Sequence, residues 1–519
     1  MMEALGVTRF SIPADLDGED VLASAEERFR VSYPDRAHSG GRGRSVWYLD
    51  SFDWRAFRSG LCVEADGDEA RLVSLRDRGI RHRGRTCGTP RFWRDFPEGP
   101  FREAMRDLLA CRALLPLASV ARTRREFRVL NADDKTVVRA YVEESELLDG
   151  RARGKRKRDV VVEPVRGYER DAVGVEAWLR EMGLEESAGS GFEAATAAAG
   201  LRPGDYTSSL DLPLERGMAT RRAAAVVFRR LLDVVVANEA GIRDDIDTEF
   251  LHDFRVAIRR TRSALSHFKD VLPEGDIARY KVAFRDTARS TGRLRDLDVY
   301  LLDEDRLRSF LPERLQPGLD ALFSSLRAER AGEQASVARA LDSDDYRALI
   351  DGWRRRVAAL EAPGERDQDA GAAVDVLAHS IVTHRFRRTL AVGRRVSAGS
   401  GPGQMHALRI QGKKLRYALE FFAQLFPPDA VRPLVRQLKR LQDNLGEYND
   451  LAVQQSELET RLGGGSPAPE AAAIGGLIAV LYARRREVRR EFAERFAQFA
   501  QPSNLADFER VFAALEGER

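Results

Sequence analysis

The chain has 519 residues, too many for one ordinary hydrophobic core, so its length predicts two or three domains. Hydrophobic residues make up 43% and charged residues 32%, which is typical of folded proteins and excludes a largely disordered chain. The 85 Lys and Arg residues nearly balance the 82 Asp and Glu residues, and the formal net charge is +3. Any affinity for an acidic partner must therefore come from local clustering of positive charge.

The cysteine content and the apolar segments predict a cytoplasmic protein. Three cysteines occur, Cys62, Cys87 and Cys111, and their number and spacing match neither a disulfide framework nor a metal site. The first twenty residues contain acidic side chains and no apolar core of the length that a signal peptide needs. The most apolar segment, 471–483, contains two glycines and is too short to span a bilayer, so we expect a buried helix there.

The first 200 residues alternate short β-rich segments with turns such as Asp66-Gly67-Asp68. The segments that we expect to be strands are 45–50, 60–64, 70–75, 126–130, 136–143 and 159–165. Two helices are predicted, at 101–115 and 172–182. Many short strands with few helices favour an antiparallel sheet or barrel over a doubly wound sheet. The Gly- and Ala-rich stretch 188–205 is predicted to be a linker.

From about residue 206 the apolar residues recur at helical spacing, and the segments break at Gly and Pro residues such as Pro363-Gly364 and Pro427-Pro428. β-rich segments are almost absent from this half. The predicted fold class is therefore α+β and multidomain, with an antiparallel β domain over 4–200 and an all-α bundle over 206–519.

The helical half repeats itself at an offset of 154 residues, as from His252 to His406. Residues 252–265 align without gaps with residues 406–419, and residues 292–297 align with residues 446–451 at the same offset. Two ungapped matches in one register indicate a duplicated helical unit. We place the two copies at about 206–360 and 372–519.

Each copy of the aligned helix has an apolar stripe and, on the opposite face, a basic ridge when it is built at about 100° per residue. The stripes consist of Phe254, Ile258, Thr261, Leu265 and Phe268 in the first copy and of Leu408, Gly412, Leu415, Leu419 and Phe422 in the second. The two basic ridges consist of His252, Arg255, Arg259 and Arg262 and of His406, Arg409, Lys413 and Arg416. Each helix should therefore pack by its stripe and present its ridge.

A basic helix face is usually just a solvated surface, but three features of these ridges favour a binding role. No carboxylate lies three or four residues from Arg255, Arg259 or Arg262, so no pair along the helix neutralises them. The ridge positions are basic in both copies. Further basic residues recur at helical spacing nearby: Lys281, Arg285, Arg289 and Arg293, then Arg436, Lys439 and Arg440. Like charges that converge between packed helices are unfavourable unless an anion lies between them, so the pattern predicts a polyanionic ligand.

The motifs themselves resemble a known family. The pattern His-x-[Phe/Leu]-Arg-[Val/Ile]-x-x-[Arg/Lys]-[Arg/Lys]-x-Arg occurs in both copies, followed by Leu-Arg-Asp-Leu-Asp at 294–298 and by Leu-Gln-Asp-Asn-Leu-Gly-Glu-Tyr-Asn-Asp-Leu at 441–451. Over 206–519 the chain is similar to the CHAD domain, the conserved histidine α-helical domain. This resemblance implies two pseudo-symmetric helical bundles around a basic channel that binds inorganic polyphosphate, and with it a place in the cytoplasm or at polyphosphate granules.

The resemblance also implies which residues face phosphate. These are His252, Arg255, Arg259, Arg262, Arg285, Arg289, His406, Arg409, Lys413, Arg416 and Lys439. Arginine can bridge phosphate oxygens with two hydrogen bonds, while lysine acts as a point charge. Many weak contacts along one polymer add up, so affinity should rise with polymer length and fall with salt.

The two ridge histidines, His252 and His406, have three interpretations. Each could bond a carbonyl or carboxylate near the helix start, bind phosphate, or ligate a metal. No Cys, His or Asp cluster with ligand spacing accompanies them, so metal ligation is the least favoured and no metal residue is assigned. The nearby polar residues are expected to fix helix ends or pair with structural arginines: Asp296, Asp298, Asn449 and Asp450.

Two N-terminal segments, 45–61 and 122–130, are similar to CYTH domains, and the resemblance covers about 4–200. It implies an eight-stranded antiparallel tunnel, whose active members hydrolyse triphosphate or polyphosphate with a divalent metal. Those enzymes hold Mg²⁺ or Mn²⁺ with a Glu-x-Glu-x-Lys motif. Here the corresponding strand, 5–10, has no carboxylate at either glutamate position, and a late strand keeps only Glu163. Basic residues of the pattern remain in Arg9, Arg58, Arg122 and Arg124.

We therefore predict a degenerate, non-catalytic tunnel with no catalytic residues and no cofactor, Mg²⁺ or Mn²⁺ being needed only if that domain were active. The basic run 151–158 is typical of a solvated hairpin tip, with polyanion binding or contact with nucleic acid as the alternatives. The leading hypothesis is polyphosphate binding. The alternatives are metal-dependent triphosphatase or polyphosphatase activity and non-specific nucleic-acid binding, which is not favoured because the chain has no RNP-type aromatic motif and no helix-turn-helix reader. No membrane partner is expected, and the oligomeric state is left open.

Overall fold

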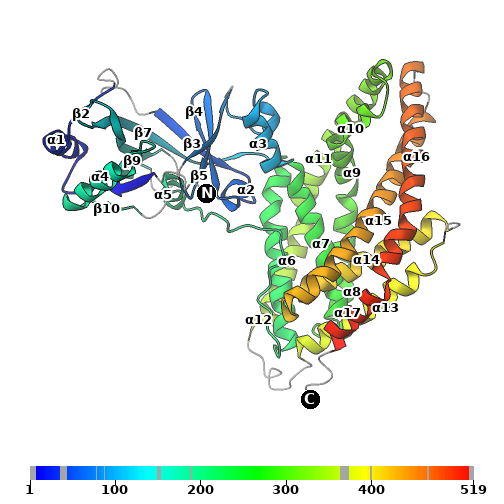
Figure 1. The fold of residues 1–519 in the computed structure, drawn as a ribbon. Helices are drawn as coiled ribbons and strands as arrows, with labels where there is room; N and C mark the ends of the chain where they lie inside the picture. Colours follow the sequence, from blue (N-terminus) through cyan, green and yellow to red (C-terminus); the bar gives the residue numbers. More distant parts are fainter. Residues whose placement is uncertain are drawn as a thin grey trace. The chain divides into compact units, whose positions relative to one another are not determined.

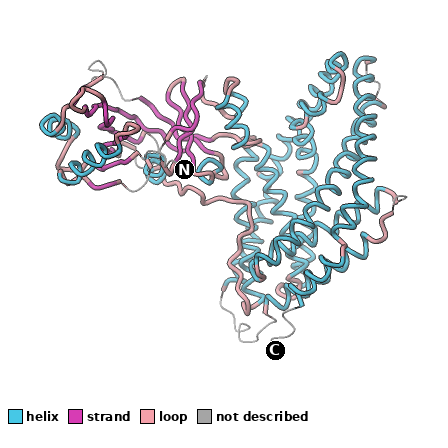
Figure 2. The backbone as a smooth tube through the Cα atoms, viewed as in Figure 1, coloured by secondary structure: helices cyan, strands magenta, loops and turns pink. Residues whose placement is uncertain are grey.

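The computed structural model of the protein describes residues 7–34, 44–77, 79–86, 88–148, 153–187, 190–362, 373–397, 400–464 and 467–513. The chain divides into two compact units, Met1–Thr207 and Ser208–Arg519, which we call the N-terminal and the C-terminal unit. The described strands gather in the first unit, whereas the second is built from helices (Figures 1 and 2). The predicted class, α+β and multidomain, is confirmed.

The N-terminal unit is built on one antiparallel sheet with the strand order β10-β1-β9-β8-β7-β3-β4-β5-β6, and β2 pairs separately with β7. In that order the strands are Glu185–Glu186, Thr8–Ser11, Arg156–Pro164, Thr136–Leu147, Leu115–Leu130, Arg44–Asp50, Leu61–Asp66, Glu69–Ser74 and Ile80–Arg85, with Val31–Ser32 as β2. All six predicted strands are present, although 126–130 is only the end of the long β7. The strand β6 escaped prediction because its sequence holds one large apolar residue, Ile80, among arginines.

The first four helices border two of the three described apolar cores of this unit. α1 (Gly18–Arg28) and α4 (Glu169–Glu181) pack on one of them, which contains Phe127 and Trp178. α2 (Arg55–Arg58) and α3 (Pro100–Leu109) border the other, and the short 3₁₀ turn η2 (Trp93–Asp95) adjoins α3. The prediction of a helix over 101–115 was too long. The chain leaves α3 at Ala110, which takes a φ of 50°, and Leu115 already begins β7.

The predicted linker 188–205 is wrong over eight of its residues, because α5 (Gly191–Ala198) lies within it. Ser190 caps this helix by accepting a hydrogen bond from the backbone N–H of Glu193, while the Glu193 carboxylate accepts one from the Ser190 backbone. Phe192 then packs on Tyr48 of β3, with ring centroids 5.8 Å apart. The capping box was legible in the sequence, but the Gly and Ala content concealed it.

The C-terminal unit contains two successions of helices. The first consists of α6 (Thr220–Arg243), α7 (Thr248–His267), α8 (Glu274–Ser290), α9 (Gly292–Leu302), α10 (Glu304–Ser309), η3 (Glu313–Leu319), α11 (Asp320–Leu341) and α12 (Asp344–Glu361). The second consists of α13 (Val374–Gly393), α14 (Pro402–Phe422), η5 (Ala423–Leu425), α15 (Pro428–Leu462), α16 (Ala468–Phe499) and α17 (Pro502–Ala513). α6 and α13 begin 154 residues apart, as the sequence offset predicts. Across the described ranges, none of these helices combines the length and hydropathy needed to cross a bilayer.

Equivalent residues of the two copies meet at the junction between them. Ala219 forms an antiparallel bridge with Ala373, and the rings of Phe268 and Phe422 lie 6.0 Å apart, centroid to centroid. The hydroxyl of Tyr300 donates to the carbonyl of Gln454 at 3.3 Å. Each pair is separated by the same 154 residues, so a local two-fold relation runs through the junction.

The copies differ in one helix. In the first copy the chain breaks at Thr291 between α8 and α9, while the equivalent residues of the second copy form the continuous α15. The predicted row Lys281, Arg285, Arg289 and Arg293 is therefore wrong at its last member. Arg293 belongs to α9 and is neutralised by Glu329 (2.6 Å) and Glu457 (2.9 Å).

Candidate functional site: two converging basic ridges

The apolar stripes of α7 and α14 are buried along their whole length, from Phe254 to Phe268 and from Leu408 to Phe422. This burial orients the opposite faces. Most ridge residues are half-buried rather than fully solvated, with His406 as the exposed exception. The predicted division of each helix into a packing face and a basic face is therefore confirmed.

The two ridges meet at Arg259 and Lys413, which occupy equivalent positions of the copies. Burial, followed by the charges of Arg409, Arg259 and Arg416, lowers the pKa of Lys413 to about 7, with Asp450 opposing the shift. Burial is the larger cause of this shift, and the charges of arginines from both copies add to it. The structure thus brings cations from both copies to one place.

Three guanidinium groups in this region carry a buried Nε without a hydrogen-bond acceptor among the described residues: those of Arg255, Arg259 and Arg409. The Nη1 of Arg255 donates to the carbonyl of Ala288 at 2.6 Å and to the hydroxyl of Thr291 at 2.7 Å, so this side chain is held in place. Burial, reinforced by the charge of Arg259, lowers the pKa of Arg255 to about 10. Buried donors without acceptors are costly, and an anion would satisfy them.

The two histidines differ in their surroundings. The Nδ1 of exposed His406 lies 3.2 Å from the side-chain oxygen of Asn449, the arrangement of a histidine hydrogen-bonded near a helix start. His252 is half-buried, and burial together with the charge of Arg295 lowers its pKa. No group of three or more His, Cys, Asp or Glu that could hold a metal occurs in the described part of the chain.

Acidic residues pair with two arginines of the second ridge. Asp450 lies 3.7 Å from Arg409, and Glu420 lies 3.2 Å from Arg416. Burial, with a further contribution from Asp450, raises the pKa of Asp296, so these two equivalent carboxylates are neighbours across the junction. The deeply buried Asp298 instead pairs with Arg330 at 2.9 Å, the structural pairing predicted for this group.

The remaining predicted residues lie further from the meeting point. Burial and the charge of Arg285 lower the pKa of Arg262, which places α8 beside the first ridge. Arg285 pairs with its neighbour Asp286 at 3.1 Å, while Arg289 and Lys439 are exposed and form no ion pair with any described residue. Arg295 of α9 was not predicted. It lies close to His252 and Arg255, and its position in the second repeated motif was the available signal.

The N-terminal unit holds a different arrangement, in which arginines converge on a carboxylate. Arg9 contacts Glu143 and Asp159, each at 2.8 Å, and Arg124 pairs with the same Glu143. Arg122 pairs with Glu64 at 3.1 Å and approaches Glu143 to 3.8 Å. Against the opposing effect of burial, the charges of Arg9, Arg124 and Arg122 lower the pKa of Glu143 well below its usual range. Arg9, Arg122 and Arg124 are therefore occupied by carboxylates of the same unit.

Two other residues singled out in the N-terminal sequence, Arg58 and Glu163, have different partners. Arg58 donates to the carbonyls of Gly204 and Tyr206, and Glu163 accepts a hydrogen bond from the Tyr141 hydroxyl at 3.2 Å. Residues 5 and 6 of the predicted first strand and residues 151 and 152 of the basic run lie outside the described residues. The run is not wholly a hairpin tip, because β9 begins at Arg156, which pairs with Glu146 at 2.9 Å.

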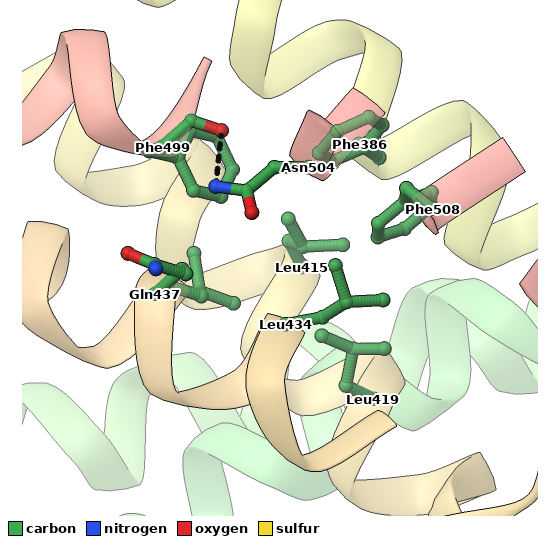
Figure 3. A pocket seen from close by; sticks show the side chains of 9 residues that line it. Phe386, Leu415, Leu419, Leu434, Gln437, Phe499, Asn504 and Phe508 are labelled. Atoms are coloured by element: carbon green, nitrogen blue, oxygen red, sulfur yellow. Dashed lines mark hydrogen bonds between the residues drawn. The ribbon is translucent and has the colours of Figure 1, made fainter. Parts of the chain in front are cut away.

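An apolar pocket in the second copy offers no anion site. It is lined by Phe386, Leu415, Phe499 and Phe508 among others, and none of its lining residues is charged. Figure 3 shows these side chains facing one another, with the Asn504 amide donating to the carbonyl of Phe499. The basic surface and this pocket are therefore separate features.

The family model described as the CHAD domain matches residues 226–459. The C-terminal unit contains a CHAD domain. Among solved structures, the crystal structure of the CHAD domain from the plant Ricinus communis is 25% identical, with a TM-score of 0.44, and the match covers 60% of this chain and 97% of that one. PptA from Streptomyces chartreusis is 17% identical, with a TM-score of 0.41, and the match covers 55% and 100%. A search of curated proteins found no match.

The matched part of the CHAD domain runs from within α6 to within α15, so it contains both basic ridges and the junction where they meet. The antiparallel N-terminal unit lies outside the match. Its strand pairings form a path from β10 to β6, and no described pairing joins the two ends.

Proposed function

We propose that the CHAD domain binds inorganic polyphosphate along its two basic ridges. The observation that carries the proposal is the meeting of cations from both copies around Arg259 and Lys413, with buried Nε groups that lack acceptors. Crowded like charges cost free energy in the unliganded protein, and a chain of phosphates would both offset the repulsion and accept the unused hydrogen bonds. A polymer could contact both copies at once.

The composition of the ridges favours polyphosphate over nucleic acid. Non-specific binders of single-stranded nucleic acid combine cations with aromatic side chains on which bases stack. The predicted phosphate-facing residues are Arg, Lys and His alone, and Tyr417, the tyrosine beside Arg416, is buried. Polyphosphate has no bases, so cations and hydrogen-bond donors are sufficient to bind it.

We further propose that the N-terminal unit has a structural rather than a hydrolytic role. Glu143 and Asp159 are engaged by Arg9, and Glu143 also by Arg124. Carboxylates that are held this way are poorly placed to bind a divalent cation. Phosphate release from tripolyphosphate with Mg²⁺ or Mn²⁺ by the intact protein, abolished by Glu163→Ala, would overturn this part of the proposal.

A competition titration tests the main proposal. Long-chain polyphosphate, single-stranded RNA and duplex DNA of matched charge are titrated into the full chain at about 150 mM salt, where weak surface attraction is largely screened. We expect polyphosphate to bind most tightly. Tighter binding of either nucleic acid would contradict the proposal.

Charge reversal then locates the site. Arg255→Glu with Arg409→Glu changes equivalent positions on both ridges, and we expect the affinity for polyphosphate to fall at least tenfold without unfolding. The matched control is Arg339→Glu with Arg355→Glu, two exposed arginines on α11 and α12 that form no ion pair with any described residue. Equal affinity of the ridge variant and this control would place binding elsewhere.

A further inference from the structure

The two copies differ at the equivalent positions Ser266 and Glu420, where only the second copy has a carboxylate. Arg260 of α7 donates to the Glu420 carboxylate of α14 from Nε (3.1 Å) and Nη2 (2.7 Å), and its Nη1 donates to the backbone carbonyl of Ser208 at 3.1 Å. A pocket beside this pair is lined by Ser209 and Leu210. On this side of the junction, Glu420 neutralises Arg260, and the segment that begins at Ser208 lies against Arg260.

The equivalent place on the other side has no such acid. At the offset of 154 residues, Lys414 corresponds to Arg260, but Ser266 corresponds to Glu420. Two cations are added there, because Lys281 replaces the equivalent Val435 and Arg385 of α13 replaces the equivalent Leu231 of α6. The local symmetry therefore creates a second place with more cations and one carboxylate fewer.

Lys281, Arg385 and Lys414 come from three different helices, and all three are half-buried. No ion pair joins any of them to another described residue. Burial lowers the pKa of each, reinforced for Lys414 by the charges of Arg385 and Arg388, and no acidic group offsets these shifts. Half-buried like charges that lie near one another without a counter-charge favour the binding of an anion.

His267 is the buried residue on which the charges of all three cations act. Its ring is only 4% exposed, packs 6.1 Å from the ring of Phe421, and has Nε2 3.2 Å from the Ser263 hydroxyl. Burial, and then the charges of Arg385, Lys281 and Lys414, lower the pKa of His267 to about 3. The charges of all three cations therefore act on one buried histidine.

We propose that Lys281, Arg385 and Lys414 form a second oxyanion site that takes a single phosphate group. On α14, Lys414 points about 100° away from the ridge residue Lys413, so this site is distinct from the ridge. Its chemistry does not depend on polyphosphate binding by the ridges. The phosphate group can come from a free short phosphate or from one residue of a long polymer, and both sources are tested below.

The test uses the full chain with the ridge variant Arg255→Glu/Arg409→Glu as background, so that ridge binding is removed. Tripolyphosphate, orthophosphate and long-chain polyphosphate are titrated calorimetrically at low salt. We expect the background variant to keep one binding site for tripolyphosphate. Adding Lys281→Gln and Arg385→Gln should weaken this binding at least tenfold, while adding the control pair Arg339→Gln and Arg355→Gln should leave it unchanged.

A second variant makes the two copies alike at the equivalent positions 266 and 420. Ser266→Glu introduces the carboxylate that Glu420 provides in the other copy, and it should pair with Lys414. We expect it to abolish tripolyphosphate binding in the ridge background and to raise Tm without ligand, because the like charges gain a counter-charge. The control is Ser336→Glu, an exposed serine on α11, which should do neither.

Loss of all tripolyphosphate binding in the ridge variant alone would overturn the second site and leave the proposed function intact. Unchanged binding in Ser266→Glu would overturn it as well. Conversely, full long-chain polyphosphate affinity in the ridge variant, lost only with Lys281→Gln/Arg385→Gln, would uphold the second site and contradict ridge binding. Where tripolyphosphate binds, competition by orthophosphate identifies a free-phosphate site, whereas no competition by orthophosphate together with tighter binding of the long polymer identifies a polymer contact.

Discussion

Phe268 and Phe422 occupy equivalent positions in the two copies, and their rings meet edge to face with centroids 6.0 Å apart. Both side chains are buried, at the ends of the apolar stripes of α7 and α14. A contact between a residue and its own repeat equivalent requires the helices to cross near a two-fold axis. The ridges of the same two helices approach each other separately, at Arg259 and Lys413.

This contact predicts a coupled loss of stability. Phe268→Ala and Phe422→Ala should each lower the free energy of unfolding by about 3–5 kcal/mol, as expected for buried phenylalanines. Because the rings contact each other, the double variant should lose about 0.5–1.5 kcal/mol less than the sum of the single losses. Urea denaturation measures all three. Strict additivity would mean that the two copies do not pack through this pair.

Lys413 predicts a proton linked to ligand binding. Its pKa in the free protein is about 7, below the ordinary value of 10.5, because burial and neighbouring arginines disfavour its charged form. A bound polyanion favours the charged form and raises this pKa, so binding near pH 8 to 9 should take up roughly one proton, while binding at pH 6 should take up none.

Titration calorimetry at pH 8.5 in buffers of different ionisation enthalpy measures this uptake. Lys413→Met should remove it, whereas the exposed Lys439→Met should keep it. The sign for stability follows from the same shift. Lys413 destabilises the free folded protein fully below pH 7, and this penalty disappears as the pH rises from 7 toward 10.5. Equal proton uptake by both variants would assign it to another group.

The salt dependence of the binding constant should show how many cations the polymer contacts. The logarithm of the binding constant should fall linearly with the logarithm of salt concentration, and each neutralised ridge cation should reduce the slope by about one. Arg409→Gln and Arg259→Gln should each flatten the slope in this way. Arg293→Gln should not change it, because Glu329 and Glu457 already neutralise Arg293. A flattened slope in Arg293→Gln would contradict the assignment of that residue.

The N-terminal cluster predicts a strong structural effect of one carboxylate. Glu143→Gln should lower the free energy of unfolding of this unit by about 3–5 kcal/mol, because Arg9 and Arg124 lose a buried counter-charge. The exposed neighbour Glu144 pairs loosely with Arg156, and Glu144→Gln should cost less than about 1 kcal/mol. Chemical denaturation followed by near-ultraviolet circular dichroism compares the two variants.

The folded-state pKa of Glu143 is lowered, so its stabilising contribution is present above the ordinary pKa of 4.5 and is lost as the pH falls below that value. Wild-type stability should therefore drop more steeply in acid than the stability of Glu143→Gln. Parallel acid profiles would show that this carboxylate does not stabilise the fold.

By itself, the sequence determined the α+β division, most strands, the duplication and the two faces of α7 and α14. These features depend on local periodicity and on the constant 154-residue offset between the copies, and both can be seen in the order of the residues. The sequence did not reveal α5, because composition hid its capping box, or β6, because an edge strand with one large apolar residue shows no alternation. The sequence also suggested that Arg293 continues the row of Lys281, Arg285 and Arg289. The helix break at Thr291 places Arg293 on a different helix.

Only the tertiary structure decided which charges are paired. Arg293 and Arg260 meet glutamates from distant helices, whereas Lys281, Arg385 and Lys414 meet none among the described residues. In the N-terminal unit, Arg9 and Arg124 are matched by Glu143, more than a hundred residues from Arg9 along the chain. Whether a cation is neutralised depends on which carboxylate comes within a few ångströms in space, and that information is absent from any local pattern.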